Sequence, residues 1–154
     1  MILLDWFTSG RKALGEEWMF ERFHSVNEVI IDGRRVARDA MLLENQTGET
    51  HQPELSRPLA KRLEPYSCYA MLFLSGPLVQ SIVARLHEKL RSVSVMRTST
   101  PERVLWAITS IEDERMFMIR VAGIETEDVK GWLKESLRPL EDVIGIDTYR
   151  KTFV

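Results

Sequence analysis

The chain has 154 residues, of which 44% are hydrophobic and 29% are charged, and its formal net charge is −2. This length supports one core or at most two small lobes, and the balanced charge gives no electrostatic reason to expect nucleic acid or an anionic membrane as a partner. The single cysteine, Cys68, excludes an internal disulfide, and no apolar run approaches the ~20 residues of a membrane span. We therefore expect a cytoplasmic protein with no nucleic-acid and no membrane partner.

The first 43 residues are rich in strand signals. Residues 2–7 predict a buried strand, and a partly alternating pattern predicts another over residues 17–23. Residues 26–31 and 34–43 flank Asp32-Gly33, a dipeptide typical of tight hairpin turns because glycine tolerates positive φ. Because the strand pattern begins next to the initiator Met, we expect a fragment or a short form of a longer protein.

Residues 44–67 interrupt this pattern with polar residues and three prolines. A short helical turn fits Leu59 to Leu63, and the Asn45-Gln46-Thr47 sequon is treated as coincidental. We interpret residues 1–154 as a single incomplete domain. In this interpretation the boundary loop 44–67 separates a β-rich part (1–43) from an α+β part (68–154).

The second half alternates between strands and helices. A short strand (68–74) precedes a helix that starts at Ser75-Gly76-Pro77 and has apolar residues every four positions until about Arg91. A hairpin over residues 104–121 then leads to a second helix, for which Thr126 is the predicted cap and Pro139 the predicted end. Residues 68–142 thus predict a ferredoxin-like β-α-β-β-α unit as one alternative for the fold.

The most distinctive motif lies near the N-terminus. It reads Trp6-x-Thr8-x-Gly10-Arg11-x-Ala13-x-Gly15-Glu16-x-Trp18-x-Phe20, and its aromatic flanks predict strand, tight turn and strand. The two glycines indicate special backbone geometry. Arg11 could form a planar bidentate contact with Glu16 or with Glu17, and Trp6, Trp18 and Phe20 are expected in the core.

This motif resembles the central motif of the urease accessory protein D family, called H in some bacteria. The run Arg38-Asp39-Ala40-Met41-Leu42-Leu43 resembles the acidic and aliphatic segment that follows in the family, and Tyr149-Arg150-Lys151 resembles its C-terminal end. The resemblance covers essentially the whole chain and corresponds to the C-terminal half to two thirds of the family. The residues that carry it are Trp6, Thr8, Gly10, Arg11, Gly15, Glu16, Trp18, Asp39 and Arg150.

The resemblance implies a non-enzymatic role in urease maturation. It implies a mainly β (α+β) fold with a β-helix-like stack of strands and two C-terminal helices. It also implies a metallochaperone-like scaffold that binds the urease apoprotein and the F and G accessory proteins, with nickel in transit and no tightly bound cofactor. For Arg11 and Glu16 it favours a structural or channel-lining role. The alternative hypothesis is a small α+β protein-binding module unrelated to urease.

Metal and enzyme signatures are weak. His24, His51 and His87 are scattered, Cys68 stands alone, and no closed metal site is visible, so no metal ligands are assigned. The glycines of the motif do not match a P-loop, and no Gly-x-Ser-x-Gly motif occurs. Arg34, Arg35 and Arg38 are flanked by acidic residues and fit a solvated strand face as well as they fit a nucleic-acid patch.

Overall fold

The computed structural model describes residues 1–45, 58–92, 101–111 and 115–152. The chain divides into two compact units. Unit 1 combines Met1–Phe7 with Cys68–Val154, and unit 2 comprises Thr8–Ser67. The N-terminal strand, predicted as part of the segment 1–43, therefore belongs to the sheet of the C-terminal segment.

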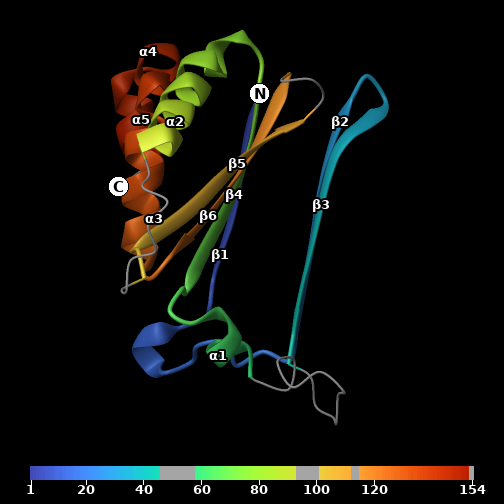
Figure 1. Cartoon of the computed structure of the whole chain (residues 1–154), viewed down its shortest axis with the longest axis vertical. Coiled ribbons are helices and arrows are strands. Elements are labelled where there is room, and N and C mark those ends of the chain that lie inside the picture. The colour runs from blue at the N-terminus through green and yellow to red at the C-terminus, as the bar shows by residue number, and fades with distance from the viewer. Residues whose placement is uncertain (46–57, 93–100, 112–114, 153–154) are drawn as a thin grey trace. The chain divides into compact units, whose positions relative to one another are not determined.

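Unit 1 is built on a four-stranded sheet of order β1-β4-β6-β5 (Figure 1). Both β4 and β5 run antiparallel to β6, which lies between them. The predicted strands of the second half are confirmed, although the predicted turn at residues 112–114 lies outside the described residues. The strands are β1 (Ile2–Thr8), β4 (Cys68–Ser75), β5 (Val104–Ile111) and β6 (Met116–Gly123).

Two amphipathic helices pack on one face of this sheet. The helix α2 (Gln80–Ser92) follows the short 3-10 turn η2 (Pro77–Val79), and α3 (Thr126–Ser136) follows β6 (Figure 1). Their buried apolar residues join those of β4 and β6 in one core, whose fully buried members include Leu72, Leu74, Ile82, Ile119 and Val129. The sequence β4-α2-β5-β6-α3 confirms the predicted β-α-β-β-α order, with β1 as the fourth strand of the sheet.

The start of α3 differs from the prediction. The helix is capped by Glu125, not by Thr126, because Asp128 turns back and accepts a hydrogen bond from the Glu125 amide at 3.0 Å. Arg103 donates two hydrogen bonds to the same Asp128 carboxylate at 2.8 and 2.9 Å. These hydrogen bonds therefore link Arg103, the residue before β5, to the first turn of α3.

The chain has more C-terminal helical segments than the two predicted. Pro139 does not simply end a helix: it lies in the 3-10 turn η3 (Arg138–Leu140), because its fixed φ suits a first helical turn. Two short helices follow, α4 (Glu141–Ile144) and α5 (Ile146–Thr152). None of the helices in the described part of the chain is long and apolar enough to cross a membrane.

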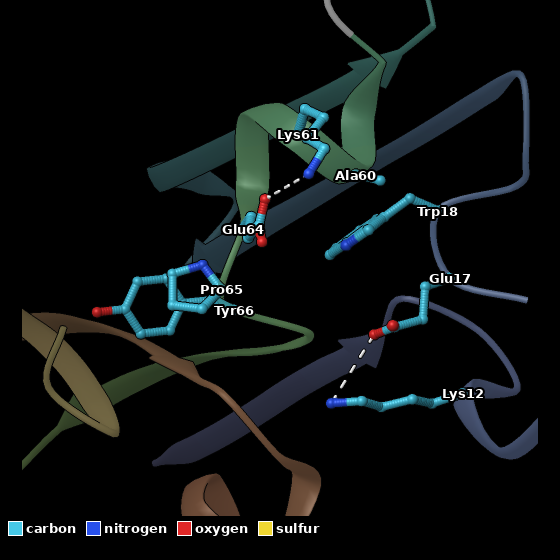
Figure 2. A pocket seen from close by; sticks show the side chains of 8 residues that line it. All are labelled: Lys12, Glu17, Trp18, Ala60, Lys61, Glu64, Pro65 and Tyr66. Atoms are coloured by element: carbon cyan, nitrogen blue, oxygen red, sulfur yellow. Dashed lines mark hydrogen bonds and ion pairs between the residues drawn. The ribbon is translucent and has the colours of Figure 1, made fainter. Parts of the chain in front are cut away.

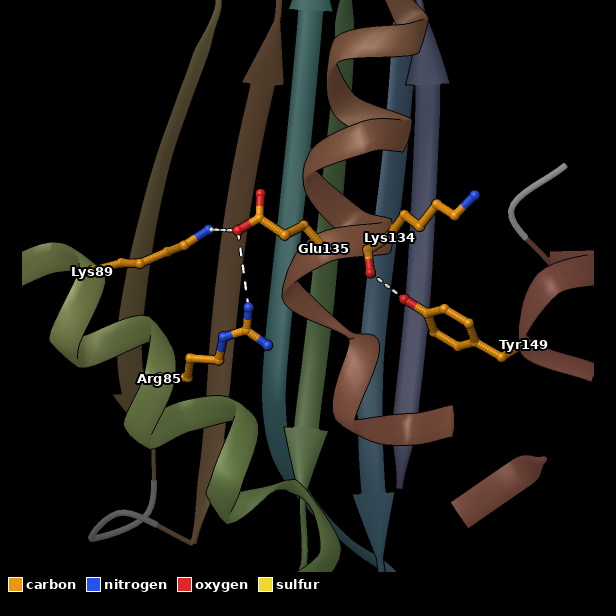
Figure 3. A network of polar contacts seen from close by, with 5 residues as sticks. All are labelled: Arg85, Lys89, Lys134, Glu135 and Tyr149. Carbon is orange, nitrogen blue, oxygen red and sulfur yellow. Dashed lines mark hydrogen bonds and ion pairs between the residues drawn. The ribbon is translucent and has the colours of Figure 1, made fainter. Parts of the chain in front are cut away.

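Polar contacts hold the helices of unit 1 to one another (Figure 3). On α3, Glu135 accepts a hydrogen bond from Lys89 at 2.8 Å and lies 3.9 Å from Arg85, both on α2. The Lys89 hydrogen bond lowers the pKa of Glu135. The buried Tyr149 of α5 donates its hydroxyl hydrogen to the carbonyl of Lys134, and burial raises the pKa of this phenol. The last helix is thus anchored by one buried side chain.

Unit 2 contains a two-stranded hairpin of β2 (Arg22–Ile31) and β3 (Arg34–Glu44), with a bulge between Val29 and Ile30. Both Asp32 (φ 50°) and Gly33 (φ 76°) have positive φ, as the predicted tight turn requires. The short α1 (Leu59–Leu63) and the 3-10 turn η1 (Lys12–Leu14) complete the unit.

Three charged residues on one face of this hairpin form ion pairs. Glu28 lies 2.9 Å from Arg35 and 3.3 Å from Arg38. The sequence allowed two interpretations of these arginines, a solvated strand face or a nucleic-acid patch. The ion pairs agree with the solvated strand face.

Two strand predictions in the first half need correction. The strand over residues 2–7 forms but is not buried, because β1 lies at the edge of its sheet. The strand predicted over residues 17–23 starts only at Arg22, because Trp18 adopts a left-handed conformation (φ 56°) that interrupts an extended chain.

The only cysteine provides a test of the core of unit 1. The Cys68 thiol is fully buried, and burial raises its pKa, an effect that a hydrogen bond with Thr126 partly offsets. Because the thiolate is the reactive form, we expect labelling of the native protein by Ellman's reagent at pH 8 to be on the order of 100-fold slower than labelling in guanidinium chloride. Prompt labelling of the native protein would contradict this packing.

Candidate functional site

After β1 ends, residues 9–20 of the motif form a compact loop in unit 2. Gly10 has a φ of 134°, and a Cβ built on it would lie 2.1 Å from the carbonyl oxygen of Glu16. No side chain fits in that space, so Gly10 is required by a close approach of backbone to backbone. Gly15 has a φ of 72° and ends η1, but a Cβ on it would meet no atom within 4 Å. The predicted backbone role therefore holds for both glycines, for different physical reasons.

Backbone hydrogen bonds close this loop. The Trp18 amide donates to the Ser9 carbonyl at 2.8 Å, and the Ser9 amide donates to the Ser67 carbonyl at 2.7 Å. The Glu16 amide donates to the carbonyl of Arg11 at 3.3 Å. The structure is a closed turn containing a 3-10 segment, so the predicted strand–turn–strand interpretation of the motif is wrong beyond Thr8.

Arg11 and Glu16 form the bidentate pair that the sequence allowed. The Nε and Nη2 atoms of Arg11 donate to the two carboxylate oxygens of Glu16 at 2.7 and 3.1 Å. The Arg11 side chain is 74% exposed, so the pair lies at the surface and adds little to stability. Its outward position makes it available to a binding partner.

Asn45, the first residue of the sequon expected to be coincidental, also holds this loop. Its amide nitrogen donates to the carbonyls of Phe20 at 2.9 Å and Trp18 at 3.4 Å, and its amide oxygen accepts from the Leu59 amide at 2.8 Å. Both backbone polar groups of the strained Trp18 are therefore hydrogen-bonded. Its N–H donates to Ser9, and its C=O accepts from Asn45. A left-handed conformation costs of order 1–3 kcal/mol and persists only when the surroundings impose it.

The indole of Trp18 is buried, as predicted, and lines a pocket of about 300 Å³ in unit 2. Figure 2 shows its ring between two ion pairs, Lys12–Glu17 at 3.9 Å and Lys61–Glu64 at 3.2 Å. The lining residues are Lys12, Glu17, Trp18, Ala60, Lys61, Glu64, Pro65 and Tyr66. No local pattern in the sequence predicts this pocket, because five of its eight lining residues come from residues 60–66, more than 40 positions after Trp18.

The other predicted site residues do not join this loop. Thr8 is exposed at the end of β1, and Asp39 lies on β3 opposite Asn27. Trp6, expected in the core, is 45% exposed on β1 in unit 1, and Arg150 is exposed on α5 of the same unit. The structure thus brings together Gly10, Arg11, Gly15, Glu16 and Trp18 from the predicted set.

The described residues contain no group of three or more His, Cys, Asp or Glu side chains placed to hold a metal ion. His24 is exposed on β2, four residue pairs along the hairpin from Glu28, and His51 lies outside the described residues. The candidate site is a partly charged surface with an aromatic pocket.

The two glycines can be distinguished by substitution. We expect Gly15→Ala to cost about 1 kcal/mol, because only its left-handed φ is strained, and Gly10→Ala to cost more than about 3 kcal/mol, because the new methyl overlaps a backbone oxygen. Urea unfolding followed by tryptophan fluorescence measures both. Equal losses for the two variants would contradict the close approach at Gly10.

Asn45 gives a second test. We expect Asn45→Ala to cost about 2 kcal/mol, because two carbonyls lose a donor and one amide loses an acceptor. Asn45→Asp should cost at least as much, because a carboxylate oxygen would then face the carbonyls of Trp18 and Phe20. If aspartate is tolerated better than alanine in urea unfolding, the amide is not oriented as described.

Comparison with known proteins shows which family and which individual proteins the chain is similar to. A family model described as UreD urease accessory protein matches residues 1–151. A urease accessory protein UreD of Anaeromyxobacter sp. is 31% identical, over 99% of this chain and 47% of its own length. Urease accessory protein D of Arabidopsis thaliana is 28% identical (97% and 55%), and urease accessory protein 4 of Cryptococcus neoformans is 27% identical (88% and 43%).

This chain spans about half the length of these curated relatives. The resemblance carried by the N-terminal motif is confirmed by the match, which covers both units and nearly every described residue. The chain belongs to the UreD family of urease accessory proteins.

Proposed function

We propose that this chain acts in urease maturation as a non-enzymatic scaffold. The observation that carries the proposal is the family match over residues 1–151. The family is one of accessory proteins, which agrees with the prediction of a protein that is not an enzyme. The ferredoxin-like order of unit 1 is compatible with this family, so the alternative of a binding module unrelated to urease loses its main support.

The geometry of the motif supports a binding role. Its glycines and Trp18 shape the backbone, while Arg11 and Glu16 point outward as a planar ion pair. A guanidinium at the surface can exchange its carboxylate for one on a partner and keep two hydrogen bonds. The motif loop, defined as residues 9–20, is the surface that we assign to partner binding.

The partners in this proposal are the urease apoprotein and the F and G accessory proteins, in the cytoplasm. Nickel is the cargo of the assembly and no cofactor is tightly bound. Nickel accepts carboxylate and imidazole ligands, and a transit path needs only transient contacts. The β-helix-like stacking of strands implied by the family resemblance is part of the same proposal.

The test is co-expression of the whole chain with an F-type accessory protein, followed by size-exclusion chromatography with light scattering. We expect a stable complex with the wild-type chain. Arg11→Glu should weaken the complex about tenfold or more, the loss expected for one charge-assisted bidentate contact. Failure of the wild-type chain to form a complex would contradict the proposed F partnership.

A matched control is available in unit 1. The side chain of Arg91 is 75% exposed and pairs with Glu88 at 3.1 Å, nearly as Arg11 is exposed and paired in unit 2. Arg91→Glu changes charge to the same extent on a different surface, so the complex should persist. Equal weakening by both variants would show a general charge effect and remove the assignment to the motif loop.

A further inference from the structure

The pocket that Trp18 lines in unit 2 combines aromatic and charged side chains from two segments of the chain. The motif loop supplies Lys12, Glu17 and Trp18, and the rest of the lining comes from residues 60–66. The volume of about 300 Å³ lies at the lower end of the range for ligand pockets. A pocket of this size suits one large side chain or a small molecule.

Hydrogen bonds fix the two walls of this pocket to each other. The Asn45 side chain donates to the carbonyl of Trp18 on one wall and accepts from the Leu59 amide, at the start of α1, on the other. Arg62 of α1 also donates to the last carbonyl of β3 at 3.1 Å. The pocket is therefore formed without a ligand, which lowers the cost of ordering its walls on binding.

Two carboxylates line the pocket, and Figure 2 shows one on each side of the indole. Glu17 accepts a hydrogen bond from the Ser9 hydroxyl at 3.4 Å, and Glu64 directly follows α1. The nitrogen of Lys12 lies 3.9 Å from Glu17, which is too far for a hydrogen bond. Lys61 lies 3.2 Å from Glu64 in an exposed pair, which contributes little. Both carboxylates can therefore accept a stronger partner.

We propose that this pocket binds a guanidinium group, carried by an arginine side chain of a partner segment. A guanidinium is planar, is more weakly hydrated than an ammonium and forms two parallel hydrogen bonds with one carboxylate, so it displaces a lysine favourably. Lys12 and Lys61 then withdraw into solvent, to which 42% and 69% of their side-chain surface is already exposed. The indole adds attraction, because tryptophan is the aromatic side chain that attracts cations most strongly.

The two lysines of the pocket also raise the question of an anionic ligand, which the same contacts disfavour. An incoming carboxylate would replace one carboxylate by another at each lysine and would gain no hydrogen bonds. It would also enter beside Glu17 and Glu64, and an aromatic ring face, which carries negative charge, does not attract it. A guanidinium gains at the carboxylates and at the indole, so the pocket favours this cation.

The pocket itself does not depend on the proposed role in urease maturation. Only the source of the arginine, a partner segment, rests on that proposed function. A small guanidinium compound tests the pocket alone. Its failure to bind would leave the role in urease maturation unaffected, and failure of the co-expression experiment would leave the pocket unaffected.

NMR titration of the full chain with acetylarginine amide, followed at the indole N–H of Trp18, tests the proposal. We expect saturable shifts with a dissociation constant on the order of 1 mM. Acetylcitrulline amide has a similar shape without the charge and should bind at least about tenfold more weakly. The absence of saturable shifts, equal binding of the citrulline compound, or tighter binding of acetylglutamate amide would overturn the proposal.

Charge removal at the two carboxylates locates the binding. Glu17→Gln and Glu64→Gln keep the shape of the pocket, and each should weaken binding of acetylarginine amide about tenfold. Glu88→Gln is the matched control and should leave binding unchanged. Glu88 is 73% exposed and pairs with Arg91 three residues away at 3.1 Å, much as Glu64 pairs with Lys61.

The control also defines the contrary results. Equal weakening by Glu88→Gln and Glu64→Gln would show a general charge effect and overturn the proposal. Unchanged binding in Glu64→Gln would overturn it as well. Because the Glu64 side chain is 61% exposed, this variant keeps the test decisive if Glu17→Gln fails to fold.

Discussion

The structure of the motif loop depends on the close approach of the Glu16 carbonyl to Gly10. This approach uses the volume that a Cβ would occupy and requires a φ that side chains rarely adopt. Because the chain turns back at this point, Arg11 comes into register with Glu16 and the Trp18 amide reaches the Ser9 carbonyl. Without the close approach at Gly10, the chain would not turn back here, and the Arg11–Glu16 and Trp18–Ser9 contacts could not form together.

The loop is stabilised by backbone and amide hydrogen bonds more than by charge. The Arg11–Glu16 and Lys12–Glu17 pairs are exposed and contribute little. The strained Trp18 is held by Ser9 on one side and by Asn45 on the other, and burial of its indole adds apolar stabilisation. The residues of the motif loop thus divide into a group that shapes the backbone and an ion pair that remains on the surface. This division favours recognition of a partner over chemistry at the loop.

Local signals in the sequence predicted local structure well. The Asp32-Gly33 turn, the four-residue period of α2 and the turn at Leu59–Leu63 each depend on near neighbours, and all three are confirmed. The interpretation of residues 17–23 as a strand was wrong because a left-handed Trp18 leaves no mark on an alternating pattern. Asn45 was missed because its hydrogen bonds join residues 14 to 27 positions apart. The pocket was missed because it joins Lys12, Glu17 and Trp18 to residues 60–66, which are farther apart still. The exposure of Trp6 depends on the order of strands in the sheet, which no residue of β1 specifies.

Hydrogen–deuterium exchange of the wild-type chain, resolved by residue with NMR, tests whether the motif builds a fixed loop. We expect the amides of Ser9, Trp18 and Leu59 to exchange slowly, with similar protection, because they belong to one closed hydrogen-bonded loop. The amide of Lys12, which donates to the carbonyl of its near neighbour Gly10 at 3.1 Å, should exchange faster. Exchange of Trp18 and Ser9 at the rate of an unstructured peptide would contradict the claim that the motif builds a fixed loop.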